Sequence, residues 1–191
     1  MDSALREKYG ERLDILDALS RNIEADTIQI LRGTPHIDRI CFRVKSVESF
    51  IIKANDPENN PQYLDPLVEI EDQVAGRIIV FFISDIDSVI QRIQSNYHQV
   101  ESKRRKPLKD EEFGYESHHT VCMIAPQLKP SGWEAFEDLP YTFELQVRTI
   151  FMHAYAEPQH DIGYKSSKEL PSIIKRELAW VAASAWGADF Y

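Results

Sequence analysis

The stretch YTFELQVRTIFMHAYAEPQHDIGYK, residues Tyr141 to Lys165, changes its hydrophobic period from two to about 3.6 along its length. In its first half Tyr141, Phe143, Leu145 and Val147 alternate with Thr142, Glu144, Gln146 and Arg148. Successive side chains of a strand point to opposite faces, so this alternation predicts one buried face and a second face with a carboxylate, an amide and a guanidinium. The helical period that follows predicts a helix. Two polar surfaces then meet at a strand-to-helix corner, where ligands often bind.

A polar stripe is expected on that helix. His153, Glu157 and His160 are spaced i, i+4 and i+7, which places them on one face near the end of the strand that carries Arg148. Their order differs from the zinc motif HExxH, so we expect a buried polar network that supports Arg148, or direct phosphate contacts, rather than a zinc site. Pro158 is expected to kink or end the helix between Glu157 and His160.

Length and composition bound the class of protein. With 191 residues, 43% of them hydrophobic, the chain is long enough for one domain, with a helical part at 1–35, a central part at 36–165 and a final helix at 166–191. The sequence shows neither a membrane-spanning apolar run nor a secretory signal, so a cytoplasmic location and no membrane partner are expected. The net charge of −9 argues against non-specific adhesion to nucleic acid. Cys41 and Cys122 have no CxxC spacing and are expected to be small buried hydrophobes.

The rest of the chain alternates between helical and strand patterns. Helices are expected from Asp2 to about Leu31, from a Ser46 cap to Lys53, from an Asp85 cap to Tyr97 and from Ser172 to Trp186, strands at 40–45, 78–83 and 120–125, and loops at 55–66 and 126–140. The strand at 78–83 is apolar throughout, which is typical of a central strand. This alternation predicts an α/β or α+β domain built on one mixed sheet flanked by helices.

Charged residues lie next to these strands. Asp72 precedes one strand and Glu144 lies on another, and the two carboxylates together could hold Mg²⁺, which takes one or two carboxylates plus substrate phosphates. Cations that could clamp a polyphosphate stand at strand edges: Arg43, Lys45, Lys53, Arg77 and Arg148. Taken singly, each of these groups is better explained as ordinary surface charge. Only their occurrence together indicates a site for a metal ion and a polyphosphate.

A glycine and a tyrosine mark a turn before the strand at 120–125. An aromatic ring at Tyr115, next to Gly114, either stacks on a base or anchors the turn. Upstream, the basic run Lys103 to Lys109 is followed directly by the acids Asp110 to Glu112. The chain has neither a P-loop nor a GxGxxG motif, so a nucleotide is expected to be held by side chains rather than by a backbone cradle.

Four segments together resemble the synthetase domain of the RelA/SpoT family, the alarmone pyrophosphokinases, including its small single-domain and toxin members. They are RVKS at 43–46, DQVAGRIIV at 72–80, FGYESHH at 113–119 and ELQVRTIFMHAYAEPQHDIGYK at 144–165, in the order typical of the family. The resemblance covers about residues 37–186 and implies a nucleotidyltransferase-like fold, with 36–165 as the catalytic core of a single synthetase domain. It also implies Mg²⁺-dependent transfer of the β,γ-pyrophosphate of ATP to a ribose 3′-hydroxyl.

The resemblance assigns roles to individual residues. Asp72 and Glu144 bind Mg²⁺, and Glu144 is also the candidate general base for the attacking hydroxyl. It implies that ATP is bound by Arg43, Lys45, Ser46, Lys53, Arg77 and Arg148, with Arg43 and Arg77 on the two faces of adenine. It implies that the acceptor is bound by Tyr115, which stacks on the base, together with Ser117, His119, Gln146, His153, Lys103, Arg104 and Arg105.

The acceptor is left open. Synthetases that use GDP or GTP usually carry a lysine shortly before the Gly-Tyr pair and an arginine or glutamine after it, where this chain has Asp110 to Glu112 and Glu116. The departure resembles the toxin-like branch that modifies the 3′-terminal adenosine of tRNA, which leaves room for an antitoxin or regulatory partner. The basic run from Lys103 could serve a nucleotide's phosphates or an RNA backbone. No hydrolase portion precedes the domain, so synthesis without hydrolysis is expected, and the oligomeric state is open.

Two other classes of protein share parts of this pattern. A non-catalytic nucleotide sensor on the same fold is the alternative, but it would need loss of the metal carboxylates or the clamp cations, and Asp72, Glu144, Arg43 and Arg77 are all present. A nucleotidyltransferase that releases pyrophosphate tends to show a paired DxD after a Gly-Ser turn, which this chain lacks.

Overall fold

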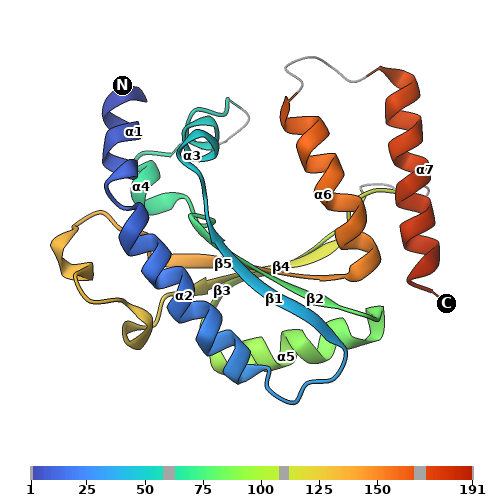
Figure 1. The fold of residues 1–191 in the computed structure, drawn as a ribbon, viewed down its shortest axis with the longest axis horizontal. Coiled ribbons are helices and arrows are strands. Elements are labelled where there is room, and N and C mark those ends of the chain that lie inside the picture. The colour runs from blue at the N-terminus through green and yellow to red at the C-terminus, as the bar shows by residue number, and fades with distance from the viewer. Residues whose placement is uncertain (1, 58–62, 108–111, 166–170, 191) are drawn as a thin grey trace.

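The computed structural model describes residues 2–57, 63–107, 112–165 and 171–190, with the backbone alone at 2 and 158–165. Its strands are β1 (Ile37–Val44), β2 (Val74–Val80), β3 (Gln99–Arg105), β4 (Ser117–Met123) and β5 (Thr142–Thr149). In the described residues these five strands form one sheet in the order β1-β2-β5-β4-β3 (Figure 1). β2 runs parallel to β5, and the other neighbouring pairs are antiparallel. The predicted mixed sheet is therefore confirmed.

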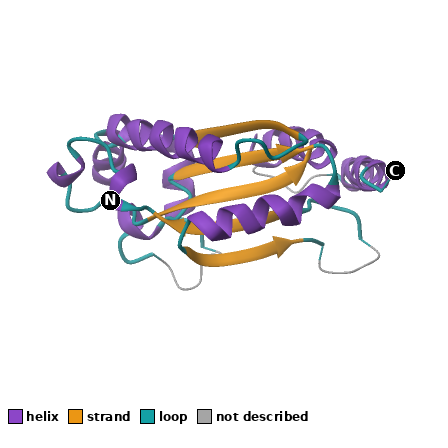
Figure 2. Cartoon of the chain, turned by 90° about the horizontal axis from the view of Figure 1, so that it is seen from below, coloured by secondary structure: helices purple, strands orange, loops and turns teal. Residues whose placement is uncertain are grey.

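Helices lie on both sides of this sheet. They are α1 (Asp2–Gly10), α2 (Leu13–Ile30), α3 (Val47–Ala54), α4 (Pro66–Glu69), α5 (Ile86–Asn96), α6 (Ile150–Lys165) and α7 (Ser172–Ala188). α2 and α5 cover one face, and α5 crosses in front of the strands when the molecule is seen from below (Figure 2). On the other side α1, α3 and α4 stand over one end of the sheet, and α6 and α7 stand over the opposite end (Figure 1). In the described ranges no helix is long and apolar enough to cross a membrane.

The main core lies between the sheet and the helices α2 and α5, and it also includes Tyr9 of α1, Phe50 of α3 and Leu67 of α4. The alternation predicted for β5 is confirmed, since Phe143, Leu145 and Val147 are at most 1% exposed. Gly76 on β2 lies on the same buried face, where an added Cβ would overlap the Phe42 ring and come within 2.8 Å of Leu145 Cδ2. Large side chains of β1 and β5 can therefore meet across β2 because this position has no side chain.

Several predicted boundaries are wrong. The strand predicted at 78–83 is β2, which ends at Val80 because its partner β1 starts opposite it at Ile37 and offers no strand residue beyond. Tyr141 is 60% exposed because β5 begins only at Thr142. The helix predicted from Asp2 to Leu31 is divided into α1 and α2 by a turn at 11–12, where the buried Arg12 is ion-paired with Asp138.

The two predicted caps differ. Ser46 caps α3 as predicted, because its hydroxyl accepts the Ser49 N–H at 3.2 Å. Asp85 stands at the start of α5 but makes no capping hydrogen bond, and one of its carboxylate oxygens lies 3.2 Å from His36 Nδ1. Of the two cysteines predicted to be buried, Cys122 is buried and Cys41 is half-buried.

The region around β3 has a strand where none was predicted. β3 consists of QVESKRR, and all of its residues after Gln99 are exposed. An edge strand with no buried face lacks the hydrophobic alternation by which strands are recognised in a sequence. The positive run of the sequence therefore begins on the outer strand of the sheet, and its residues Leu108 and Lys109 lie outside the described residues.

Helix α6 continues past Pro158 to Lys165, so of the kink or end predicted there, the end does not occur. Proline removes one backbone hydrogen bond, and the bonds of the neighbouring turns carry the helix past it. α6 packs against α7 in a second, smaller core made by Met152, Tyr155, Ala182 and Ala185.

Candidate active site

The face of the sheet opposite α2 and α5 carries most of the predicted site residues. Strand register aligns Cys41, Arg77, Gln146, His119 and Lys103 in one row across the five strands. The next row contains Arg43 and Glu144. Paired residues on adjacent strands point to the same side, so residues from five separate segments of the chain share one polar face.

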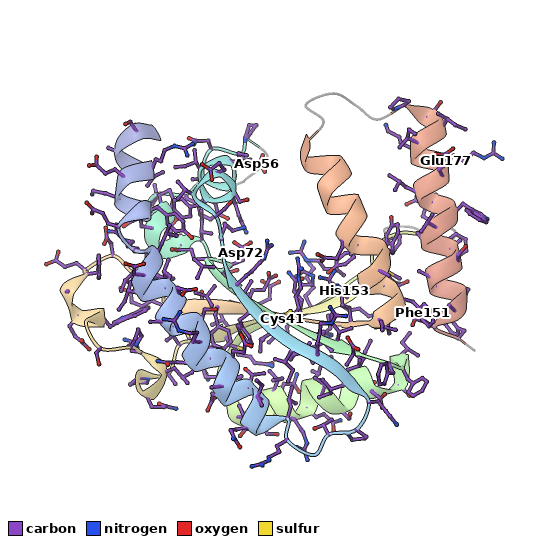
Figure 3. All side chains as sticks on the ribbon, in the orientation of Figure 1. Cys41, Asp56, Asp72, Phe151, His153 and Glu177 are labelled. Atoms are coloured by element: carbon purple, nitrogen blue, oxygen red, sulfur yellow. The ribbon has the colours of Figure 1, made fainter. Side chains whose placement is uncertain are left out.

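Two lysines hold Asp72 at one end of this face. Lys45 Nζ lies 2.8 Å from Asp72 Oδ2, and Lys53 Nζ lies 2.9 Å from Asp72 Oδ1. Burial by itself would raise the pKa of Asp72, but the two lysines outweigh it and lower the pKa. The carboxylate is therefore ionised at neutral pH. In Figure 3 Asp72 lies near α3 and His153 lies on α6, at opposite ends of the polar face.

Glu144 is held by a histidine and an amide. His119 Nδ1 lies 2.5 Å from Glu144 Oε1, and Gln146 Nε2 donates to Oε2 at 2.9 Å. Burial opposes ionisation, but the hydrogen bond and charge of His119, with the bond from Gln146, lower the pKa of Glu144, and the nearby charge of Asp72 acts in the opposite direction. Two ionised carboxylates thus lie within electrostatic range of each other.

A polar network joins β2, β5 and α6. Glu157 Oε1 accepts from Arg77 Nη1 at 2.7 Å and from Arg148 Nη2 at 3.3 Å, and His153 Nδ1 lies 3.6 Å away. These contacts place His153 and Glu157 in a network around Arg148, as predicted, but Glu157 is 46% exposed rather than buried, and the side chain of His160 lies outside the described residues. Burial and the charge of Arg148 lower the pKa of His153, which is therefore neutral at physiological pH.

Tyr115 connects the histidine to the arginine. Its hydroxyl lies 3.3 Å from His119 Nε2, and the Arg148 guanidinium carbon lies 5.7 Å from its ring centroid. The ring also packs against the small core between α6 and α7. It is half-buried, so anchoring of the turn and stacking on a base are compatible.

In the described part of the chain, some predicted residues make no ion pair with the two carboxylates. Arg43 projects from β1 into solvent and makes no ion pair with the part of the chain that the structure describes. Lys103, Arg104 and Arg105 lie on the exposed edge strand β3, where Arg104 Nη2 pairs with Glu116 at 3.1 Å. The charge of Glu116 is therefore offset by one residue of the basic run.

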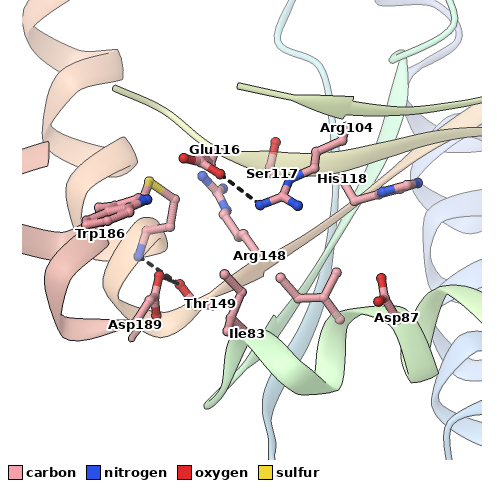
Figure 4. Close-up of a pocket in the computed structure, with 12 residues that line it drawn as sticks. Ile83, Asp87, Arg104, Glu116, Ser117, His118, Arg148, Thr149, Trp186 and Asp189 are labelled. Atoms are coloured by element: carbon pink, nitrogen blue, oxygen red, sulfur yellow. Dashed lines mark hydrogen bonds and ion pairs between the residues drawn. The ribbon is translucent and has the colours of Figure 1, made fainter. Parts of the chain in front are cut away.

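A separate cavity of about 210 Å³ lies at the far end of β5 (Figure 4). It is lined by Ser117, Arg148 and Asp189 among others, and Asp72 and Glu144 do not line it. Ser117 is 5% exposed. The structure therefore does not bring Ser117, predicted to contact the acceptor, to the two carboxylates.

Asp72 and Glu144 fit Mg²⁺ by their chemistry. Both are ionised oxygen ligands, and among the described residues no group of three or more His, Cys, Asp or Glu side chains could hold a metal ion. Mg²⁺ suits such a pair because it usually takes one or two carboxylates and completes its shell with water and substrate phosphates.

The contact of Glu157 with Arg77 was not predicted from the sequence. The helical spacing of Glu157 from His153 was the only signal, and this spacing says nothing about Arg77, which lies on another strand. The link between His119 and Glu144 was also missed, because neither residue's neighbours in sequence indicate how β4 aligns with β5.

The chain is thus an α/β domain on a mixed sheet, whose polar face gathers two carboxylates among lysines and arginines, groups that suit a metal ion and phosphates. Comparison with known proteins agrees: the family described as "Region found in RelA / SpoT proteins" matches residues 42–169. The chain belongs to the RelA/SpoT family.

Several Bacillus subtilis proteins are moderately similar to this chain in sequence or in fold. The chain is 29% identical over 187 residues to GTP pyrophosphokinase YwaC of Bacillus subtilis (strain 168), covering 95% of this chain and 83% of that protein. It is 30% identical over 157 residues to GTP pyrophosphokinase YjbM of the same organism, covering 80% and 69%. Its fold is similar to the crystal structure of small alarmone synthetase 1 from Bacillus subtilis, with a TM-score of 0.77, 23% identity and coverage of 96% and 93%. Small alarmone synthetase 2 gives a TM-score of 0.63 at 28% identity, with coverage of 96% and 91%.

Proposed function

We propose that the chain is a pyrophosphokinase that transfers the β,γ-pyrophosphate of ATP to the ribose 3′-hydroxyl of GDP or GTP. The observation that carries the proposal is the ionised Glu144, bonded to His119, beside Asp72 with its two lysines. Family membership supports the reaction class, and the relatives YwaC and YjbM are named GTP pyrophosphokinases. Structures of small alarmone synthetase 1 from Bacillus subtilis are bound to AMPCPP and to its product pppGpp.

In the proposed reaction a bond forms between the 3′-oxygen and the β-phosphorus of ATP, and AMP leaves. The attacking hydroxyl loses its proton to Glu144, whose orientation His119 and Gln146 hold. Lys45 and Lys53 neutralise the phosphates, because their ammonium groups already converge at the end of the polar face.

The remaining assignments concern the two bases and the metal. Arg43 and Arg77 take adenine between them, and Tyr115 stacks on the acceptor base. Asp72 and Glu144 would hold Mg²⁺ through their carboxylate oxygens, and the ion would offset the charge of the transferred group.

A free guanine nucleotide is the proposed acceptor. Glu116 stands where an acid disfavours a free nucleotide. It is paired with Arg104, so a 5′-phosphate would not meet Glu116 as an isolated charge. Lys103 and Arg105 are exposed on the same strand and are available to a polyphosphate. Of the other acids near this position, Asp110 and Glu111 lie outside the described residues, and Glu112 is exposed.

A tRNA acceptor is the second candidate. It is favoured by one observation, that the cations of β3 lie on an exposed edge strand, where an extended phosphate backbone could follow them. The toxin-like activity that such an acceptor would imply rests on this surface alone.

The experiment that tests both candidates is a labelling assay. The full chain is incubated with ATP carrying ³²P at the γ-position and, in separate reactions, with GDP, GTP, AMP or bulk tRNA. Label on GDP and GTP is expected. Label on tRNA alone would make the second candidate the function, and binding of ATP without label on any acceptor would leave the non-catalytic sensor.

A further inference from the structure

One carboxylate oxygen on α6 faces three side chains of the candidate site. The contacts of Glu157 Oε1 reach Arg77 on β2 at 2.7 Å, Arg148 on β5 at 3.3 Å and His153, one turn earlier on α6, at 3.6 Å. A single residue therefore ties the helix to two strands of the polar face.

The two arginines need an acid between them. Arg148 is 3% exposed, and after burial the charge of Arg77 is among the causes that lower its pKa. A guanidinium cannot escape this repulsion by losing its proton. Glu157 thus offsets charge that would otherwise push the two arginines apart, and it does so from a half-exposed position.

The contact also sets how Arg77 is oriented. A carboxylate binds a guanidinium at its N–H edge, in the plane of the group, which leaves the two faces free to stack on a ring. Arg43, the other arginine proposed for adenine, is exposed and without an ion pair in the described residues. One half of the proposed adenine clamp is therefore oriented before the nucleotide arrives, and the other half is free to close on it.

We infer that Glu157 is a positioning residue for the donor nucleotide, which holds the guanidinium of Arg77 in the orientation that stacks on adenine. The inference rests on the proposed function, because it takes adenine as the ligand of Arg77. Losing the orientation means that ATP must immobilise a free arginine on binding, which costs affinity on the order of 3- to 10-fold.

The test is a double-mutant cycle on the full chain, with binding of AMPCPP in the presence of Mg²⁺ measured by calorimetry. Glu157→Gln is expected to raise the Kd roughly 3- to 10-fold, and Arg77→Ala to raise it as well. The double variant is expected to bind like Arg77→Ala alone, because Glu157 acts through Arg77. Glu157→Asp, which keeps the charge, should fall between the parent and Glu157→Gln. In steady-state assays the KM for ATP should rise while the KM for the acceptor stays near the parental value.

The matched control is Glu177→Gln, an exposed glutamate on α7 (Figure 3), which should leave the Kd unchanged. Parental binding by Glu157→Gln, tighter binding, or losses that add in the double variant would each overturn the role of Glu157. Failure of the parent to bind AMPCPP would overturn the proposed function itself, and this inference with it.

Discussion

At the scale of single residues, Asp72 and Glu144 are half-buried carboxylates that stay ionised. A buried carboxylate without partners becomes protonated, because burial disfavours the charged form. Two lysines prevent this at Asp72, whereas a histidine and an amide prevent it at Glu144. Both metal binding and general-base catalysis require the ionised form, so these partners matter for the proposed chemistry as much as the acids do.

Replacing Glu144 by glutamine tests its proposed role. The amide fits the same strand position, so the fold should be kept, while transfer should fall by at least ~10²-fold because base and metal ligand are lost together. The rate of label transfer and the circular dichroism spectrum check this. Glu101→Gln, an exposed acid in the same row of the sheet, is the control. Activity above about a tenth of the parent would contradict the assignment.

Asp72 should also make stability depend on acid. Its pKa is lower in the folded protein than in the unfolded chain, so its contribution is present above about pH 4 and is lost as the pH falls through the folded value. Asp72→Asn should be less stable than the parent near neutral pH, since Lys45 and Lys53 lose their partner, and should lose less stability on acidification. Urea unfolding from about pH 7 to about pH 3 measures both slopes. Parallel curves for the two proteins would remove Asp72 as the cause.

At the scale of elements, the packing of β1, β2 and β5 depends on one glycine. Gly76→Ala should destabilise the fold by about 1–3 kcal/mol, because the new Cβ overlaps Phe42 and crowds Leu145 in a closely packed core. The free energy of unfolding in urea is the measurement. Gly10→Ala, where an added Cβ meets nothing within 4 Å, is the matched control and should change little. Equal effects at the two positions would contradict this account of the core.

The edge strand β3 should distinguish the two acceptors. With tRNA, binding should weaken steeply with salt, and removing Lys103 and Arg105 should reduce the slope by roughly one for each cation. With GDP, the same double alanine variant should raise the acceptor KM with only a shallow salt dependence. Arg21→Ala is the control, because it removes an exposed cation on α2, away from β3. A flat salt response with tRNA, together with efficient labelling of GDP, would exclude RNA backbone binding by this strand.

At the scale of the whole molecule, the site spans two cores. Asp72 lies in the turn before β2 and Glu144 lies on β5, two strands of the main core, whereas His153 and Glu157 lie on α6, which packs against α7. Thr149, at the end of β5, donates to Asp189 of α7 at 2.7 Å and ties the second core to the sheet. A displacement of α7 should therefore change the geometry of the site.

Overpacking the contact between α6 and α7 tests that coupling. Ala182 is fully buried there, so Ala182→Leu should cost about 1–3 kcal/mol of stability and lower transfer by shifting α6. Thermal unfolding and label transfer measure the two effects. The control is Glu177→Leu, at an exposed position of the same helix. It should leave the thermal stability and the rate of label transfer near parental values. Full activity in a destabilised Ala182→Leu variant would show that α6 keeps its place without this packing.

The sequence alone was enough for features that depend on one segment. The alternation of β5, the helix after it and the Ser46 cap follow from local periodicity and hydrogen-bonding chemistry, and the four motifs identified the family that the comparisons confirm. The single-domain organisation and the acceptor stay predictions. At Pro158 the local rule allowed either a kink or an end, and the structure excludes the end, because the neighbouring turns outweigh one lost hydrogen bond.

Only the tertiary structure decided which distant residues meet. β3 has no buried face and so left no pattern in the sequence, and the register that sets His119 against Glu144 depends on how β4 and β5 pack together. The contact of Arg77 with Glu157 joins a strand to a helix from a distant segment of the chain. Periodicity reports how a segment divides its faces between core and solvent, whereas pairs across strands and helices are set by the packing of the whole chain, which no single segment encodes.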